Sequence, residues 1–233
     1  MNKELENARK IQDNLRKTVA KSLVSFVPGS GLFNMLYDEI QKQQFVQRYE
    51  EWKQLIEERL TKLENKTAQE IIDNKQFATA LLTATPIMLK TAEPEKRKYL
   101  ANGVIHALDK DMDETQLMIF FSLLDRYTIW HFRVLLFFQN PLRNKNARSF
   151  YCGLHFDVAT VSPLDFFKQA YSLNEDKNDI LRKIIHDLEA DGLMEEGTWE
   201  TTNISMTKQD LKGKRTNSFG DKFLDFILLD GQV

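Results

Sequence analysis

The sequence of residues 163–192 is PLDFFKQAYSLNEDKNDILRKIIHDLEADG. Its apolar residues recur at steps of three and four, which predicts two helices over 163–171 and 178–191. The polar run between them predicts a turn. Gly192 follows the second helix, at a position where glycine commonly ends a helix in left-handed backbone.

The residues that follow predict a small β-hairpin and a closing helix. We expect the two strands over 193–196 and 198–207, because the second is rich in threonine and both lie between turn residues. Residues 219–229 are mostly apolar and predict the last helix. Two helices, a hairpin and a final helix in this order predict a winged helix-turn-helix.

Upstream of this unit the sequence is helical in pattern. Residues 3–26 carry one apolar stripe, Pro28 and Gly29 predict a sharp turn, and 32–63 predict a long helix. Together they predict an N-terminal helical hairpin.

The middle of the chain predicts a helical bundle. We expect one or two helices over 67–91, one that begins at Pro94, and one over 114–139 that breaks near residues 127–128. Residues 142–150, with Arg143, Lys145 and Arg148, are expected to form a basic loop. The predicted fold class is therefore mostly α, with domains over 1–66 (helical hairpin), 67–125 (bundle) and 126–233 (winged helix).

The long predicted helix carries a heptad-like apolar seam. Its members lie three or four residues apart, as in helices that pack against a partner helix; they are Tyr49, Trp52, Ile56, Leu60 and Leu63. If part of this seam is exposed in the monomer, it predicts self-association or a protein partner.

Composition and motifs favour a protein without catalytic chemistry. The net charge is −2, so the whole chain has no strong attraction to nucleic acid. Cys152 is the one cysteine, which fits a reducing cytoplasm and leaves no second cysteine for a structural zinc site. No nucleophile elbow or phosphate loop is present. We therefore expect no signal peptide, no cofactor, no metal site and no catalytic residue.

Nucleic-acid binding remains one alternative. The second helix of the predicted winged helix and the segment after the hairpin carry basic residues that could contact phosphate or bases; they are Arg182, Lys183, His186, Lys212, Lys214 and Arg215. However, residues 151–233 contain nine basic and fifteen acidic residues, a net charge of −6. Phosphate would repel such a domain, so a winged helix used for packing or protein contact is favoured.

Membrane association is another alternative. The N-terminal segment places basic residues beside apolar ones, as in helices that lie on anionic bilayers; the candidates are Lys17, Lys21, Leu23 and Phe26.

Three segments resemble a known group of proteins: KRKYLANGV (96–104), LLDRYTIWHFRVL (123–135) and TNSFGDKFLDF (216–226). The pattern resembles bacterial helical proteins with a C-terminal winged helix, some of which are grouped with abortive-infection proteins of the Abi-alpha type. The resemblance implies a bacterial protein associated with phage defence or mobile elements, and it implies no catalytic residues. Taken with the seam, the sequence predicts a non-enzymatic interaction or regulatory protein.

Overall fold

The computed structural model describes residues 32–63, 66–109, 112–154 and 161–229, and these residues are mostly helical. The contacts divide the chain into two compact units, Met1–Glu50 and Glu51–Val233, and each is described by itself. The division into three domains at residues 66 and 125 stays a prediction. The predicted N-terminal hairpin includes residues 3–31, which lie outside the described residues.

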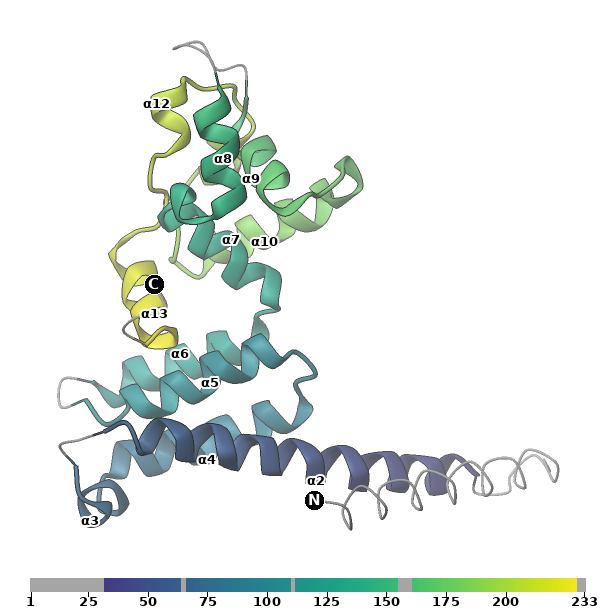
Figure 1. The fold of residues 1–233 in the computed structure, drawn as a ribbon, viewed down its shortest axis with the longest axis vertical. Coiled ribbons are helices and arrows are strands. Elements are labelled where there is room, and N and C mark those ends of the chain that lie inside the picture. The colour runs from purple at the N-terminus through teal and green to yellow at the C-terminus, as the bar shows by residue number, and fades with distance from the viewer. Residues whose placement is uncertain (1–31, 64–65, 110–111, 155–160, 230–233) are drawn as a thin grey trace. The chain divides into compact units, whose positions relative to one another are not determined.

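The first helices of the larger unit form a bundle (Figure 1). It contains the end of α2 (Leu32–Leu60), α3 (Ala68–Ile72), α4 (Lys75–Lys90), α5 (Pro94–His106) and α6 (Glu114–Arg126). Helix α4 packs against both α5 and α6. Local sequence sets the boundaries, because Thr67 and Glu70 form a capping box and Pro94 occupies the first turn of α5. Pro86 lies inside α4 without dividing it.

The predicted break near residues 127–128 is confirmed. Helix α6 ends at Arg126, and α7 (Ile129–Gln139) begins after Tyr127 and Thr128, both in extended backbone. The Lys96 ammonium group donates hydrogen bonds to the carbonyls of Asp125 (3.0 Å) and Tyr127 (2.7 Å) at this break. Lys96 is buried, and burial lowers its pKa because it removes water from the charged group. The two carbonyls take the place of that water around the ammonium group.

Short helices complete the chain after α7. They are η1 (Pro141–Arg143), α8 (Lys145–Gly153), α9 (Pro163–Tyr171), η2 (Glu175–Lys177), α10 (Asn178–Ala190), α11 (Thr198–Thr202), α12 (Lys208–Leu211) and α13 (Ser218–Ile227). The predicted helices over 163–171, 178–191 and 219–229 are confirmed within a residue or two at each end. Gly192 has φ +71°, as expected of a glycine that ends a helix.

The predicted β-hairpin is wrong. Residues 198–202 form helix α11, and the β-pairing within the described ranges consists of two isolated bridges, Val161 with Met206 and Met194 with Thr216. The threonines that suggested a strand bond to nearby backbone instead. Thr201 and Thr202 donate to carbonyls three residues back, at 3.0 and 2.8 Å. Such local bonds let the backbone turn where β-branched residues would favour a strand.

The predicted basic loop over 142–150 is also wrong, because most of it is helix α8. The side-chain oxygen of Asn144 accepts hydrogen bonds from the backbone of Asn146 (2.9 Å) and Ala147 (3.1 Å) and so starts this helix. Ala147 is fully buried and packs this helix against the core.

Helix α13 completes the core of the bundle. The Phe120 ring lies 5.1–5.4 Å from the rings of Phe219, Phe223 and Phe226. Two glycines allow α13 to approach closely. A Cβ on Gly103 would lie 2.7 Å from the Phe226 ring, and one on Gly220 would lie 2.1 Å from the Leu193 carbonyl oxygen.

None of the helices in the described ranges combines the length and apolar character required to cross a membrane.

Candidate functional site

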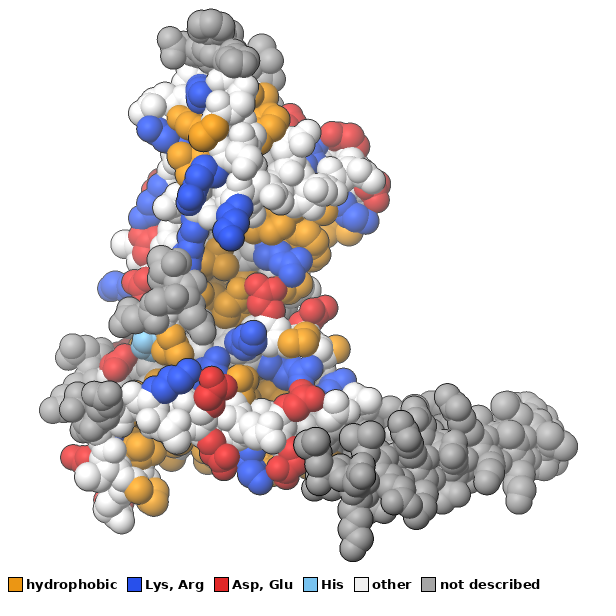
Figure 2. Space-filling view, in the orientation of Figure 1, with side chains coloured by type: hydrophobic (Ala, Val, Ile, Leu, Met, Phe, Trp, Pro, Cys, Tyr) orange, Lys and Arg blue, Asp and Glu red, His pale blue; other side chains and the backbone are white. Residues whose placement is uncertain are grey.

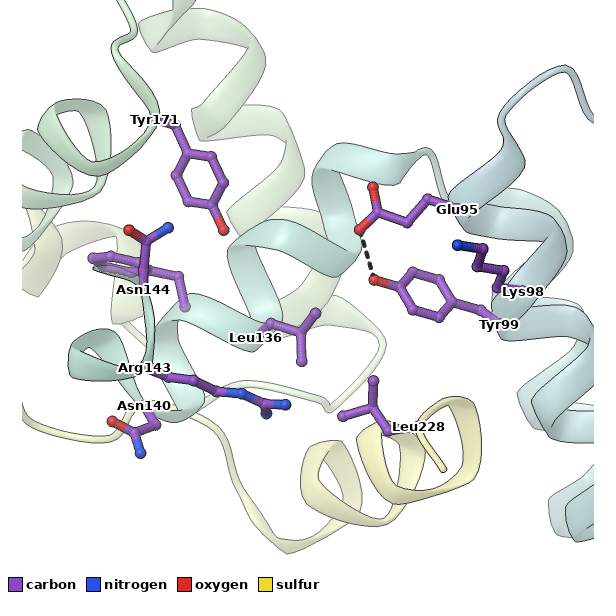
Figure 3. A pocket seen from close by; sticks show the side chains of 10 residues that line it. Glu95, Lys98, Tyr99, Leu136, Asn140, Arg143, Asn144, Tyr171 and Leu228 are labelled. Carbon is purple, nitrogen blue, oxygen red and sulfur yellow. Dashed lines mark hydrogen bonds between the residues drawn. The ribbon is translucent and has the colours of Figure 1, made fainter. Parts of the chain in front are cut away.

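The larger unit contains an open pocket of about 360 Å³ that five elements line (Figure 3). We call it the Tyr99–Tyr171 pocket. Helix α5 supplies Glu95, Lys98 and Tyr99; α7 and η1, with the residues at their ends, supply Leu136, Phe137, Asn140, Arg143 and Asn144; Tyr171 ends α9, and Leu228 follows α13.

Glu95 is already engaged by protein groups. Its carboxylate accepts a hydrogen bond from the Tyr99 hydroxyl (2.9 Å) and forms an ion pair with Arg133 (3.0 Å). Burial, and secondly the charge of Glu95, raise the pKa of Tyr99, so its hydroxyl stays protonated near neutral pH. This corner of the pocket therefore presents a compensated carboxylate and a neutral phenol.

Two cationic side chains face the pocket from opposite sides. Figure 3 shows the half-buried Arg143 side chain reaching between Leu136 and Leu228, with Lys98 across from it on α5. Lys98 is exposed and has no ion-pair partner among the residues that the structure describes. The pocket thus combines positive charge with apolar walls.

The Tyr171 ring is held at the edge of the pocket by its neighbours. It packs edge-on against Trp130, with 5.9 Å between ring centroids, and lies 4.7 Å from the Phe167 ring. Burial raises the pKa of Tyr171, although a hydrogen bond with Asn144 opposes this shift. In Figure 3 its hydroxyl points into the pocket, where a neutral phenol can donate or accept a hydrogen bond.

The amino-acid sequence does not reveal this pocket. Its lining residues come from segments up to 133 positions apart, and their neighbours in sequence give no motif. The basic character of residues 143–148 was the one available signal. No group of three metal-ligating side chains occurs within the described ranges. The side chains that line the pocket can bind a ligand through charge, hydrogen bonds and apolar contact.

Several predicted nucleic-acid residues are engaged by acidic neighbours. Lys183 forms an ion pair with Asp187 and Lys214 with Asp221, and the Nδ1 atom of His186 lies within hydrogen-bond distance of the Glu189 carboxylate, at 3.1 Å. Burial alone would raise the pKa of Asp187, but hydrogen bonds from Lys183 and His131 outweigh burial and lower it. A phosphate would have to compete with these carboxylates for the same cations.

The other three predicted nucleic-acid residues differ in exposure. Arg215 is buried, its guanidinium donates to the Gly213 carbonyl at 2.8 Å, and burial lowers its pKa. Arg182 is exposed and lies over the Trp199 ring, 5.7 Å from its centre. Lys212 is exposed. The structure therefore does not gather the six residues into one exposed basic patch.

The heptad-like seam is buried in its middle part. Trp52 and Ile56 are 3% and 7% exposed, and the Trp52 indole donates a hydrogen bond to Thr85 of α4 at 3.1 Å. Leu60 and Leu63 are half-buried. Tyr49 differs, because it is 41% exposed.

An exposed apolar surface surrounds Tyr49. Phe45 is 49% and Val46 is 56% exposed, and the rings of Phe45 and Tyr49 stack with centroids 6.1 Å apart. We call Phe45, Val46 and Tyr49 the aromatic face of α2. The membrane candidates Lys17, Lys21, Leu23 and Phe26 lie outside the described residues.

No protein-family model, curated protein or solved structure matches this chain.

Proposed function

We propose that this is a non-enzymatic interaction protein that associates with a second copy of itself through the aromatic face of α2. The observation that carries the proposal is the exposure of Phe45, Val46 and Tyr49 on neighbouring positions of one helix. Residues three and four apart share a helix face, so these side chains form one continuous surface. Aromatic residues of this kind are enriched where proteins contact one another.

The charge pattern favours an identical helix as the partner. Helix α2 contains four basic and six acidic residues, and Figure 2 shows side chains of both charges close together along the part of the helix that is drawn in colour. Such a surface suits neither an anionic bilayer nor nucleic acid, both of which select a basic one. Gln43, Gln44 and Gln47 are interspersed with the aromatic face, and neutral amides would not repel their copies in a second helix.

The oligomeric state tests this proposal. Light scattering at micromolar concentration should give a mass above that of the monomer. The double variant Phe45→Glu/Tyr49→Glu should give the monomer mass, because the introduced charges would be buried in the interface. The matched control Gln54→Glu adds an acid at an exposed position of the same helix and should leave the mass unchanged.

A strict monomer would refute self-association. A nuclease, nucleotidase or transferase activity that a point substitution abolishes would refute the non-enzymatic part.

A winged-helix DNA regulator is the alternative function. Helices α9 and α10 follow the order of a helix-turn-helix, and exposed Arg182 and Lys212 would be the contacts. The variant Arg182→Glu/Lys183→Glu should then abolish retention of DNA fragments at low salt. The absence of any retention by the parent protein would eliminate this alternative.

Membrane association and phage defence stay proposals that rest on sequence. Flotation with anionic liposomes tests the first through residues 17–26, and a protein that stays entirely with the unbound fraction would refute it. The resemblance to abortive-infection proteins supports the second, with the cytoplasm as the proposed location. Phage plaque counts with and without the expressed gene test it.

A further inference from the structure

The Tyr99–Tyr171 pocket is biased toward anions. Arg143 and Lys98 bring two positive charges to it, whereas the one carboxylate, Glu95, is compensated by Arg133 at 3.0 Å. A guanidinium has five N–H donors, so Arg143 can hold an anion alongside contacts with the protein. The ammonium group of Lys98 adds a second charge without the cost of breaking an ion pair.

The remaining walls of the pocket are largely apolar, which favours a ligand with an apolar part over an inorganic ion. Leu136 and Leu228 flank the Arg143 side chain, and the tyrosine rings close the two ends of the pocket (Figure 3). The volume of about 360 Å³ lies at the small end of the range for ligand pockets, roughly 300–1,000 Å³. An occupant that fills it would place a compact apolar body against the leucines and its acidic group at Arg143.

We propose that the Tyr99–Tyr171 pocket binds a small organic anion, a compact aromatic or aliphatic body with one carboxylate or phosphate group. Arg143 and Lys98 hold the acidic group, and Leu136 and Leu228 contact the body. This pocket shares no residue with the aromatic face of α2, so the proposal of an anion site is tested independently of self-association.

Thermal unfolding with paired probes tests the proposal. Adenosine monophosphate and phenylacetate carry the two head groups, adenosine and phenylacetamide are their neutral counterparts, and inorganic phosphate is the head group alone. A ligand present at about ten times its Kd should raise the Tm of a chain of this size by roughly 3 °C. We expect this rise with at least one organic anion and with none of the other three probes.

Four variants locate the binding. Arg143→Ala and Lys98→Ala should abolish the rise in Tm. The matched controls Arg148→Ala and Lys222→Ala remove exposed cations that do not line the pocket, and they should retain it. Because Lys98 is exposed, its variant should fold even if the Arg143 variant does not.

Each other outcome overturns the proposal. An equal rise with the neutral counterpart would exclude recognition of charge, and an equal rise with inorganic phosphate would exclude recognition of the body. A rise retained in Lys98→Ala and Arg143→Ala would place the ligand elsewhere. If the Tm rises with neither organic anion at about 10 mM, any binding is too weak to matter at cellular ligand concentrations, and the proposal is overturned.

Discussion

The Nε atom of Arg59 donates a 2.7 Å hydrogen bond to the side-chain oxygen of Asn102, and both side chains are buried. The amide nitrogen of Asn102 donates in turn to the carbonyl of Ile227, also at 2.7 Å. One asparagine therefore joins α2, α5 and α13. Burial lowers the pKa of Arg59, so the charge-assisted bond offsets part of the cost of removing the guanidinium from water.

Replacing Asn102 by alanine should destabilise the protein by about 2–4 kcal/mol. The substitution leaves a buried donor on Arg59 and a buried acceptor on Ile227 without these partners, and each unpaired group costs roughly 1–3 kcal/mol. Urea unfolding measures the loss. The control Asn203→Ala removes an exposed amide and should change the free energy of unfolding by less than about 0.5 kcal/mol. Similar values for the two variants would contradict the role given to Asn102.

Gly220→Ala should destabilise the protein although alanine favours helices. The new Cβ would lie 2.1 Å from the Leu193 carbonyl oxygen, which forces α13 away from the turn that follows α10. Overpacking of this kind costs about 1–3 kcal/mol, more than the gain in helix propensity of up to roughly 1 kcal/mol. The matched control is Gly153→Ala, whose Cβ would meet nothing within 4 Å. Thermal unfolding should show a lower Tm for the first variant alone.

Lys96→Met should loosen the break between α6 and α7. The carbonyls of Asp125 and Tyr127 would lose their shared donor, at a cost of about 1–3 kcal/mol. Lys98→Met changes an exposed lysine two residues away and should cost less than about 0.5 kcal/mol. Faster amide exchange at residues 127–131 in the first variant would locate the effect, and equal exchange in both would contradict it.

His131 should make stability fall as the solution becomes mildly acidic. Burial lowers its pKa, while hydrogen bonding to Asp187 opposes the shift. The unfolded chain therefore binds a proton at a higher pH than the folded chain does. The His131 contribution is complete above the unfolded pKa of about 6.5 and is lost as pH falls from there to the lower folded pKa.

The geometry around His131 gives the same direction. Its Nδ1 atom accepts a 3.2 Å hydrogen bond from the Thr128 backbone and so caps α7, and a proton on Nδ1 would remove that acceptor. Asp187, 3.4 Å from Nε2, opposes this loss. Urea unfolding at pH 7.5 and 5.5 should show a larger decrease for the parent than for His131→Gln. Equal decreases would assign the pH dependence to other groups.

The sequence predicted correctly those helices that begin or end at residues with a clear capping or helix-breaking role. The break at Tyr127–Thr128, the helix over 163–171 and the glycine at 192 each depend on neighbouring residues alone. The strand predicted over 198–202 was wrong because threonine hydroxyls can also bond to nearby carbonyls of a helix. Whether such a segment forms a strand or a helix depends on how Thr198 and Thr202 are buried against the rest of the fold. The loop predicted over 142–150 was wrong because the side chain of Asn144 caps a helix there, although the basic composition suggested a loop.

The candidate site was harder to predict than the fold. The Tyr99–Tyr171 pocket exists only because α5, α7, α9 and the end of α13 converge, and sequence periodicity contains no information about that convergence. The seam illustrates the same limit, since its spacing predicted a packed helix but not which members would be covered. Trp52 is covered by α4 whereas Tyr49 is exposed.

The position of α13 has a consequence for synthesis on the ribosome. Asn102 and Ile227 are 125 residues apart in sequence, and the Phe120 cluster takes three of its rings from residues 219–226. The bundle formed by residues 51–126 therefore remains without part of its core while more than ninety further residues are translated. During that interval the nascent chain exposes Phe120 and its neighbours, and chaperones that hold apolar segments would find their binding site there.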